Sequence, residues 1–178
     1  MLKTLVWVGV VLVVAVGVVL VYAATLPKDF RVSRAASIKA PREKIFPLIS
    51  DLKSFNLWNP FAKQDPSMRI TYRRTTSDKG AAFDWDSDGR GGTGSLEILD
   101  TQAPSSVTMR LDVMKPMEGH NTVVFALQQA GEATEVTWTM TGPYAFIARV
   151  IGVVVSMDRM IGGEFEKGLA ELKALAER

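Results

Sequence analysis

The chain has 178 residues, with 21 Lys or Arg and 19 Asp or Glu, which gives a nearly balanced net charge of +2. Such a balance, without a strong basic stripe, argues against nucleic-acid binding, so no nucleic-acid partner is predicted. The chain has no cysteine, which excludes disulfides, thiolate catalysis and cysteine-bound zinc.

Residues 5–24 form an apolar segment of twenty residues without a charge. A helix rises about 1.5 Å per residue, so about 20 residues cross a hydrocarbon core of roughly 30 Å. A cleavable signal peptide is the alternative, although its apolar core is usually shorter. We therefore predict a transmembrane anchor over residues 1–25, a second domain over 26–178, and a single-pass membrane location. The Lys and Arg residues after the segment favour a cytoplasmic domain only slightly, so the side of the membrane stays open.

The first part of the second domain combines one strand with short helices. Residues 30–38 alternate apolar and polar side chains, as in a strand, although Arg34 interrupts the apolar side. Pro41 stands near the first position of a predicted helix with an apolar stripe. A second helical turn is expected at residues 52–57.

The remaining chain predicts a ladder of strands and a final helix. Six strands are expected within residues 68–75, 81–85, 93–99, 107–113, 123–127 and 136–140, separated by turns rich in Gly, Asp and Pro. This regular period of two is typical of an antiparallel sheet with one buried face. Residues 157–177 change to helical spacing and predict an amphipathic helix of about five turns.

Several short motifs occur in a fixed order along the second domain. They are 38–46 (IKAPREKIF), Asp51-Leu52, Trp58-Asn59-Pro60, Gly92-Thr93-Gly94, 136–140 (VTWTM), Met157-Asp158 and 162–169 (GGEFEKGL). In this order they resemble the START-like, helix-grip superfamily, in particular its polyketide cyclase/dehydrase and lipid transport branch, abbreviated SRPBCC. The resemblance implies an α+β helix-grip fold, a curved seven-stranded antiparallel sheet around a long C-terminal helix. From the apolar segment described above, we expect one N-terminal transmembrane helix before this domain. The resemblance also implies a cavity between sheet and helix.

We expect this cavity to bind a small hydrophobic molecule: a lipid, an isoprenoid or an aromatic metabolite. The candidate ligand-binding residues are large apolar or aromatic side chains, most of them on the predicted inward faces. They are Trp58, Tyr72, Phe83, Trp85, Met109, Leu111, Phe125, Trp138, Met140, Met157, Ile161 and Phe165. The same side chains also suit an ordinary core. Likewise Gly162, Gly163 and Gly168 either leave room for a ligand or permit close helix–sheet packing.

Two other functions stay open: an enzyme of the cyclase or dehydratase type, and a protein-interaction module whose cavity is packed. An enzyme would need acid/base groups inside the cavity. Tyr72 is the best inward polar candidate, followed by Arg34 and Asp100, but a tyrosine of pKa near 10 is a poor base at neutral pH. The sequence therefore assigns no catalytic residue, and it leaves the oligomeric state open.

Three features suggest metal or phosphate sites but fail in detail. The segment DWDSDG at residues 84–89 opens like a calcium loop, yet Ser95 stands where the bidentate glutamate belongs. The glycine-rich residues 89–94 lack the lysine of a phosphate-binding loop and predict a hairpin turn. His120 is the only histidine and is expected at the surface. No metal and no cofactor is predicted.

Residues 144–155 form a second apolar segment, which Arg149 interrupts and which is too short to span a membrane. It is expected either to form a lid over the cavity or to dock on the bilayer surface.

Overall fold

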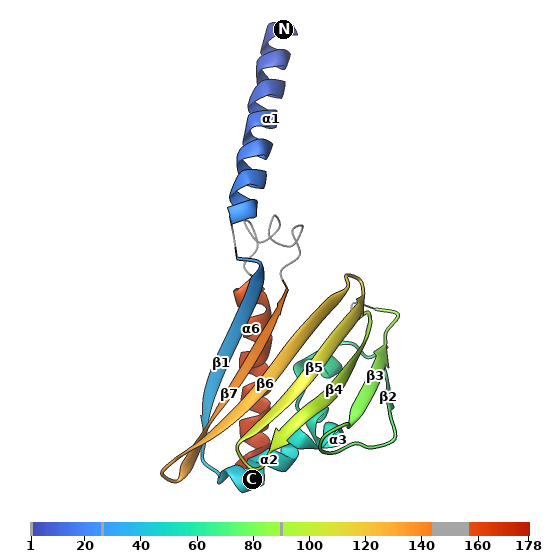
Figure 1. The fold of residues 1–178 in the computed structure, drawn as a ribbon, viewed down its shortest axis with the longest axis vertical. Helices are drawn as coiled ribbons and strands as arrows, with labels where there is room; N and C mark the ends of the chain where they lie inside the picture. The colour runs from blue at the N-terminus through green and yellow to red at the C-terminus, as the bar shows by residue number, and fades with distance from the viewer. Residues whose placement is uncertain (1, 26, 90, 144–156) are drawn as a thin grey trace.

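The computed structural model describes residues 2–25, 27–89, 91–143 and 157–178. The helix α1 (Leu2–Thr25) extends away from the rest of the chain, as Figure 1 shows. In the part of the chain that the structure describes, no helix is found with the length and hydropathy needed to cross a membrane. The transmembrane anchor therefore stays a prediction. The predicted lid or docking segment, residues 144–155, lies outside the described residues.

Seven strands form one antiparallel sheet in the order β1-β7-β6-β5-β4-β3-β2. They are β1 (Asp29–Ile38), β2 (Arg69–Tyr72), β3 (Ala82–Asp86), β4 (Thr93–Gln102), β5 (Ser106–Lys115), β6 (Gly119–Ala130) and β7 (Ala133–Pro143). Each of the seven predicted strands is present. The chain runs through β2 to β7 as a meander, and β1 then pairs with β7 at one edge (Figure 1).

One interruption of the ladder corrects a prediction. The pairing of β4 with β5 shifts between Ile98, which faces Met109, and Asp100, which faces Thr108. Such a bulge adds one residue and turns the following side chains to the other face. Asp100 is therefore exposed on the outer face, and the expectation that it points inward is wrong.

Among the described residues, four helices accompany the sheet: α2 (Arg42–Ser50), α3 (Leu52–Phe55), α4 (Pro60–Gln64) and α6 (Met157–Ala176). As predicted, α2 begins just after Pro41, and α3 follows it at the expected helical turn. The helix α4 was not predicted. Its N-cap Asn59 accepts a hydrogen bond from the Phe61 N–H, and Pro60 occupies its first position, where a missing N–H costs nothing.

The core lies between the inner face of the sheet and α6, which packs mainly against β1 (Figure 1). Phe165, Leu169 and Leu172 of α6 are fully buried and belong to the same core as the inward side chains of β6 and β7. Buried side chains of α2 and α3 close the end of the core near the C-terminus of α6. This arrangement confirms the α+β helix-grip fold.

Candidate ligand cavity

A partly open cavity of about 610 Å³ lies between the sheet, α4 and the first half of α6. Its lining is mostly apolar, with side chains from all seven strands on one side and from α4 and α6 on the other. Polar side chains occur along part of it: Asn59, Gln64, Asp65, Lys115, Glu118 and Asn121. A cavity of this size falls in the range of small-molecule binding sites.

The structure brings many of the predicted ligand-binding residues together in this lining. They are Phe83, Trp85, Leu111, Trp138, Met140, Ile161 and Phe165. The last two come from α6, and the others come from β3, β5 and β7. Their assembly follows from the period of two in the strands and the helical period in α6. That these residues bind a ligand stays a prediction.

Four of the other predicted residues, Trp58, Tyr72, Met109 and Phe125, do not line the cavity. Trp58, Met109 and Phe125 are fully buried in the core. The Trp58 Nε1–H donates to the Leu48 carbonyl oxygen at 2.8 Å. Tyr72 is partly buried, and its hydroxyl oxygen accepts a hydrogen bond from Asn56 Nδ2 at 3.1 Å. The side chain of Met157, the first residue of α6, lies outside the described residues.

The sequence reasoning missed several lining residues. Phe61 comes from α4, a helix that begins after the turn expected at residues 52–57. Asn121 precedes the predicted range of its strand, although it lies two residues before Val123 and so shares its face. Extending the predicted alternation of this strand by two residues toward the N-terminus would have placed Asn121 on the inward face.

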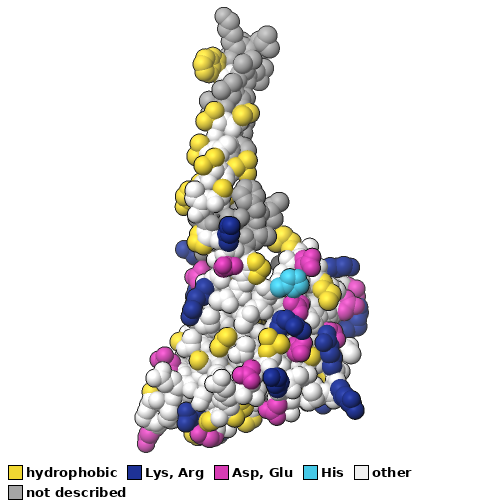
Figure 2. All heavy atoms as spheres, viewed as in Figure 1, with side chains coloured by type: hydrophobic (Ala, Val, Ile, Leu, Met, Phe, Trp, Pro, Cys, Tyr) yellow, Lys and Arg dark blue, Asp and Glu magenta, His cyan; other side chains and the backbone are white. Residues whose placement is uncertain are grey.

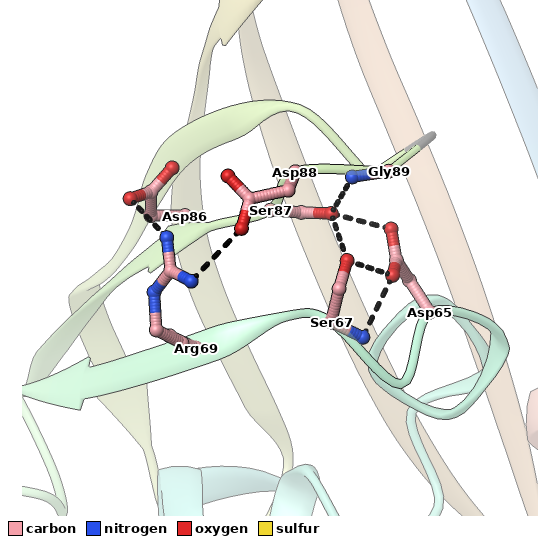
Figure 3. A network of polar contacts seen from close by, with 7 residues as sticks. All are labelled: Asp65, Ser67, Arg69, Asp86, Ser87, Asp88 and Gly89. Carbon is pink, nitrogen blue, oxygen red and sulfur yellow. Dashed lines mark hydrogen bonds and ion pairs between the residues drawn. The ribbon is translucent and has the colours of Figure 1, made fainter.

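Asp65 organises the cavity rim between α4 and the β3–β4 turn, as Figure 3 shows. Its carboxylate accepts hydrogen bonds from the backbone N–H groups of Ser67 and Gly91, at 3.0 and 2.9 Å. It also accepts from the hydroxyls of Ser67 and Ser87, at 2.6 and 2.5 Å. The Ser67 and Ser87 hydroxyls and the Gly91 N–H lower the pKa of Asp65 far below its usual range, because they stabilise the ionised form. A carboxylate satisfied in this way is a weak base.

The acidic residues of the calcium-like segment pair with arginines. Arg69 bridges Asp86 and Asp88, each at 3.0 Å (Figure 3), and Arg73 makes a two-point contact with Asp84 at 2.6 and 3.0 Å. Asp84 and Asp86 belong to β3, and Asp88 lies in the turn that follows it. Of the glycine-rich residues 89–94, the described Gly89, Gly91 and Gly92 lie in the β3–β4 turn, as expected, and Gly94 lies in β4.

Two of the three glycines of α6 allow close packing against the sheet and do not add space to the cavity. A Cβ on Gly162 would lie 2.1 Å from Nη2 of Arg34, and a Cβ on Gly168 would lie 2.8 Å from Cζ3 of Trp138. Both positions are therefore close contacts between α6 and the sheet. A Cβ on Gly163 meets no atom within 4 Å, but Gly163 is not in the cavity lining.

Arg34, a candidate inward polar residue, joins β1 to the first turns of α6. Its guanidinium contacts Asp158 at 2.9 Å and Glu166 at 2.7 Å, and hydrogen bonds to these carboxylates raise the pKa of Arg34. It does not line the cavity. His120 is at the surface, as expected, and the Asp112 carboxylate 2.8 Å from its Nδ1 raises the pKa of the imidazole.

The comparison with protein families agrees with this architecture. The family described as "Polyketide cyclase / dehydrase and lipid transport" matches residues 29–177, which include the sheet and α6. The chain belongs to this family. The polyketide cyclase/dehydrase and lipid transport family is part of the START-like, helix-grip superfamily, so the resemblance read from the motifs is confirmed. No curated protein matches the chain.

Solved structures share the helix-grip fold at low sequence identity. Protein CV1439 from Chromobacterium violaceum is 13% identical, with a TM-score of 0.59, covering 86% of this chain and 99% of its own. Protein Ms6760 from Mycobacterium smegmatis is 19% identical, with a TM-score of 0.54 and coverages of 82% and 89%. Ginseng major latex-like protein 151 from Panax ginseng is 12% identical, with a TM-score of 0.59 and coverages of 85% and 100%. These likenesses concern the fold alone.

Proposed function

We propose that this protein binds a small hydrophobic molecule, such as a lipid, an isoprenoid or an aromatic metabolite, between its sheet and α6. The observation that carries the proposal is the partly open cavity of about 610 Å³ with its mostly apolar lining. Burying apolar ligand surface there would contribute about 25 cal/mol per Å². The polar side chains along part of the lining would orient the ligand. Membership in a family whose description includes lipid transport supports the same function.

We further propose that α1 tethers the domain to a membrane beside the cavity. Residues 5–24 carry no charge, and the described side chains of α1 include exposed apolar ones such as Trp7, Val13 and Val21. Figure 2 shows hydrophobic side chains along this helix and charged ones spread over the domain. Phe30 lines the cavity only five residues after Thr25, the end of α1, a reach of at most about 18 Å. A ligand leaving the bilayer would thus have only a short distance to cross before it reaches the cavity.

The two alternatives receive less support. For a cyclase or dehydratase, neither described carboxylate of the lining is well placed as a base. Hydrogen bonds hold Asp65 as a weakly basic carboxylate, and Glu118 is exposed and pairs with His120. A protein-interaction module with a packed interior fits poorly with a cavity of about 610 Å³. Ligand binding therefore explains the geometry best.

A pair of neighbouring substitutions on β6 tests ligand binding. Val123 is buried and lines the cavity, whereas Val124 lies on the opposite face of the same strand. Tryptophan at position 123 fills cavity space, so we expect V123W to weaken binding of the fluorescent probe anilinonaphthalene sulfonate, whose aromatic rings enter apolar cavities, at least about tenfold. V124W adds the same side chain outside and should bind like the wild type. Equal affinities of both variants in a fluorescence titration would contradict the proposed site.

Membrane tethering is tested by fractionating cells that express the full chain or a chain starting at residue 27. We expect the full chain to stay in the membrane pellet after alkaline carbonate washing, because a spanning apolar helix is not released by pH or salt. The shortened chain should appear in the supernatant. Release of the full chain by carbonate would refute the anchor and leave the cavity proposal standing.

A further inference from the structure

The cavity lining contains a buried hydrogen-bond donor that nothing in the described protein satisfies. Trp138 lines the cavity and is only 3% exposed. Among the buried side-chain nitrogen and oxygen atoms of the described residues, its Nε1 is the one without a hydrogen-bond partner. Unpaired buried donors are rare, and they are costly because the N–H has given up its bond to water.

The aromatic rings that contact Trp138 offer no acceptor. Its ring stacks on Phe165, with centroids 4.0 Å apart and planes 8° apart, and it contacts the rings of Trp58 and Phe125. Gly168 packs near its Cζ3. Because Cζ3 and Nε1 lie on opposite edges of an indole, the N–H is on the edge away from Gly168. A bridging water would need two or more polar partners, which these neighbours do not supply.

Trp85, the other tryptophan in the cavity lining, has a hydrogen-bond acceptor for its indole N–H. Trp85 also lines the cavity, but its Nε1–H donates to the Gly91 carbonyl oxygen at 3.0 Å. The chain therefore provides an acceptor for one indole of this cavity and leaves the other without one. Beside Trp138, Met140 lines the cavity from the same face of β7, and its unbranched side chain can change rotamer to admit a ligand atom.

We propose that the ligand carries a neutral oxygen acceptor, such as a ketone, quinone or ester carbonyl, at its buried end, and that the Trp138 Nε1–H donates to it. This inference rests on the proposed function and names the class of ligand. The acceptor is neutral because the aromatic rings around Trp138 provide no counter-charge, and burying an unpaired carboxylate there would be very costly. Arg34, opposite Trp138 in the β1–β7 pairing, is already engaged by Asp158 and Glu166.

The test compares two ring systems of the same shape, fluorene and fluorenone, which differ by one carbonyl group. For each protein we measure both dissociation constants and take the ratio, fluorenone over fluorene. Trp138→Phe keeps an aromatic ring but removes the donor, so the ratio should rise about tenfold relative to the wild type. Trp85→Phe removes the same atoms from a satisfied indole and should leave the ratio unchanged.

A second measurement needs no variant. In ¹H–¹⁵N spectra of the full chain in detergent, fluorenone should move the Trp138 indole proton downfield, and fluorene should not. If both compounds bind but neither the ratio nor the resonance changes, the donor assignment is wrong and hydrophobic binding stands. If neither compound binds, the proposed function fails together with the donor assignment.

Discussion

Replacing Gly92 by alanine is expected to destabilise the domain by about 3 kcal/mol or more. Gly92 has a φ of +61°, a conformation that costs a residue with a Cβ about 1–2 kcal/mol. In addition, the new Cβ would lie 1.9 Å from the Lys115 carbonyl oxygen and 2.6 Å from its carbonyl carbon. Both are backbone atoms, so the end of β5 must move, and its pairing with Thr93 at the start of β4 would be lost. Urea denaturation followed by circular dichroism measures the loss.

Gly131→Ala is the matched control for Gly92→Ala. Gly131 also has a positive φ, +65°, at a hairpin turn, but a Cβ there meets no atom within 4 Å. Only the conformational cost of about 1–2 kcal/mol applies. If both variants lost the same free energy of unfolding, the close approach of Gly92 to Lys115 would not contribute to the loss in Gly92→Ala.

The same β3–β4 turn shows what the sequence could predict. The glycines of residues 91–94 indicated a hairpin turn, and the alternation on both sides gave the strands. The sequence did not reveal which glycine is required. Gly92 is constrained by Lys115 at the end of β5, more than twenty residues later, and Gly94 by the Trp85 ring, 2.4 Å from where its Cβ would be. Such constraints arise only from the tertiary structure.

The inward faces were predictable, but the depth of each side chain was not. Alternation placed Met109, Leu111, Phe125 and Trp138 on the inner side of the sheet. It could not tell that Met109 and Phe125 lie in the core, where helices fill the space, while Leu111 and Trp138 border the cavity. Asp100 shows a second limit, because a single bulge reversed the faces after Ile98 without an obvious signal in the sequence.

Replacing Trp58 by alanine is expected to cost about 3–5 kcal/mol. Trp58 is fully buried, and its ring makes edge contacts with Phe55, Phe125 and Trp138 at centroid distances of 4.9, 5.8 and 5.6 Å. The substitution opens a large void in this aromatic cluster. It also leaves the Leu48 carbonyl oxygen without its indole donor. Thermal and urea unfolding monitored by circular dichroism measure the effect.

Trp85→Ala makes the same change in side chain at a partly buried position in the cavity lining. Less packing is lost there, so its cost in stability should be about half that of Trp58→Ala or less. Trp85→Ala should weaken ligand binding more than Trp58→Ala does. Trp85 would contact the ligand directly, while Trp58 is separated from the cavity by its neighbours. Titration of both variants with anilinonaphthalene sulfonate, below their unfolding temperatures, checks this. If Trp58→Ala weakened binding more than Trp85→Ala while remaining folded, Trp58 would belong to the ligand site rather than to the core beneath it.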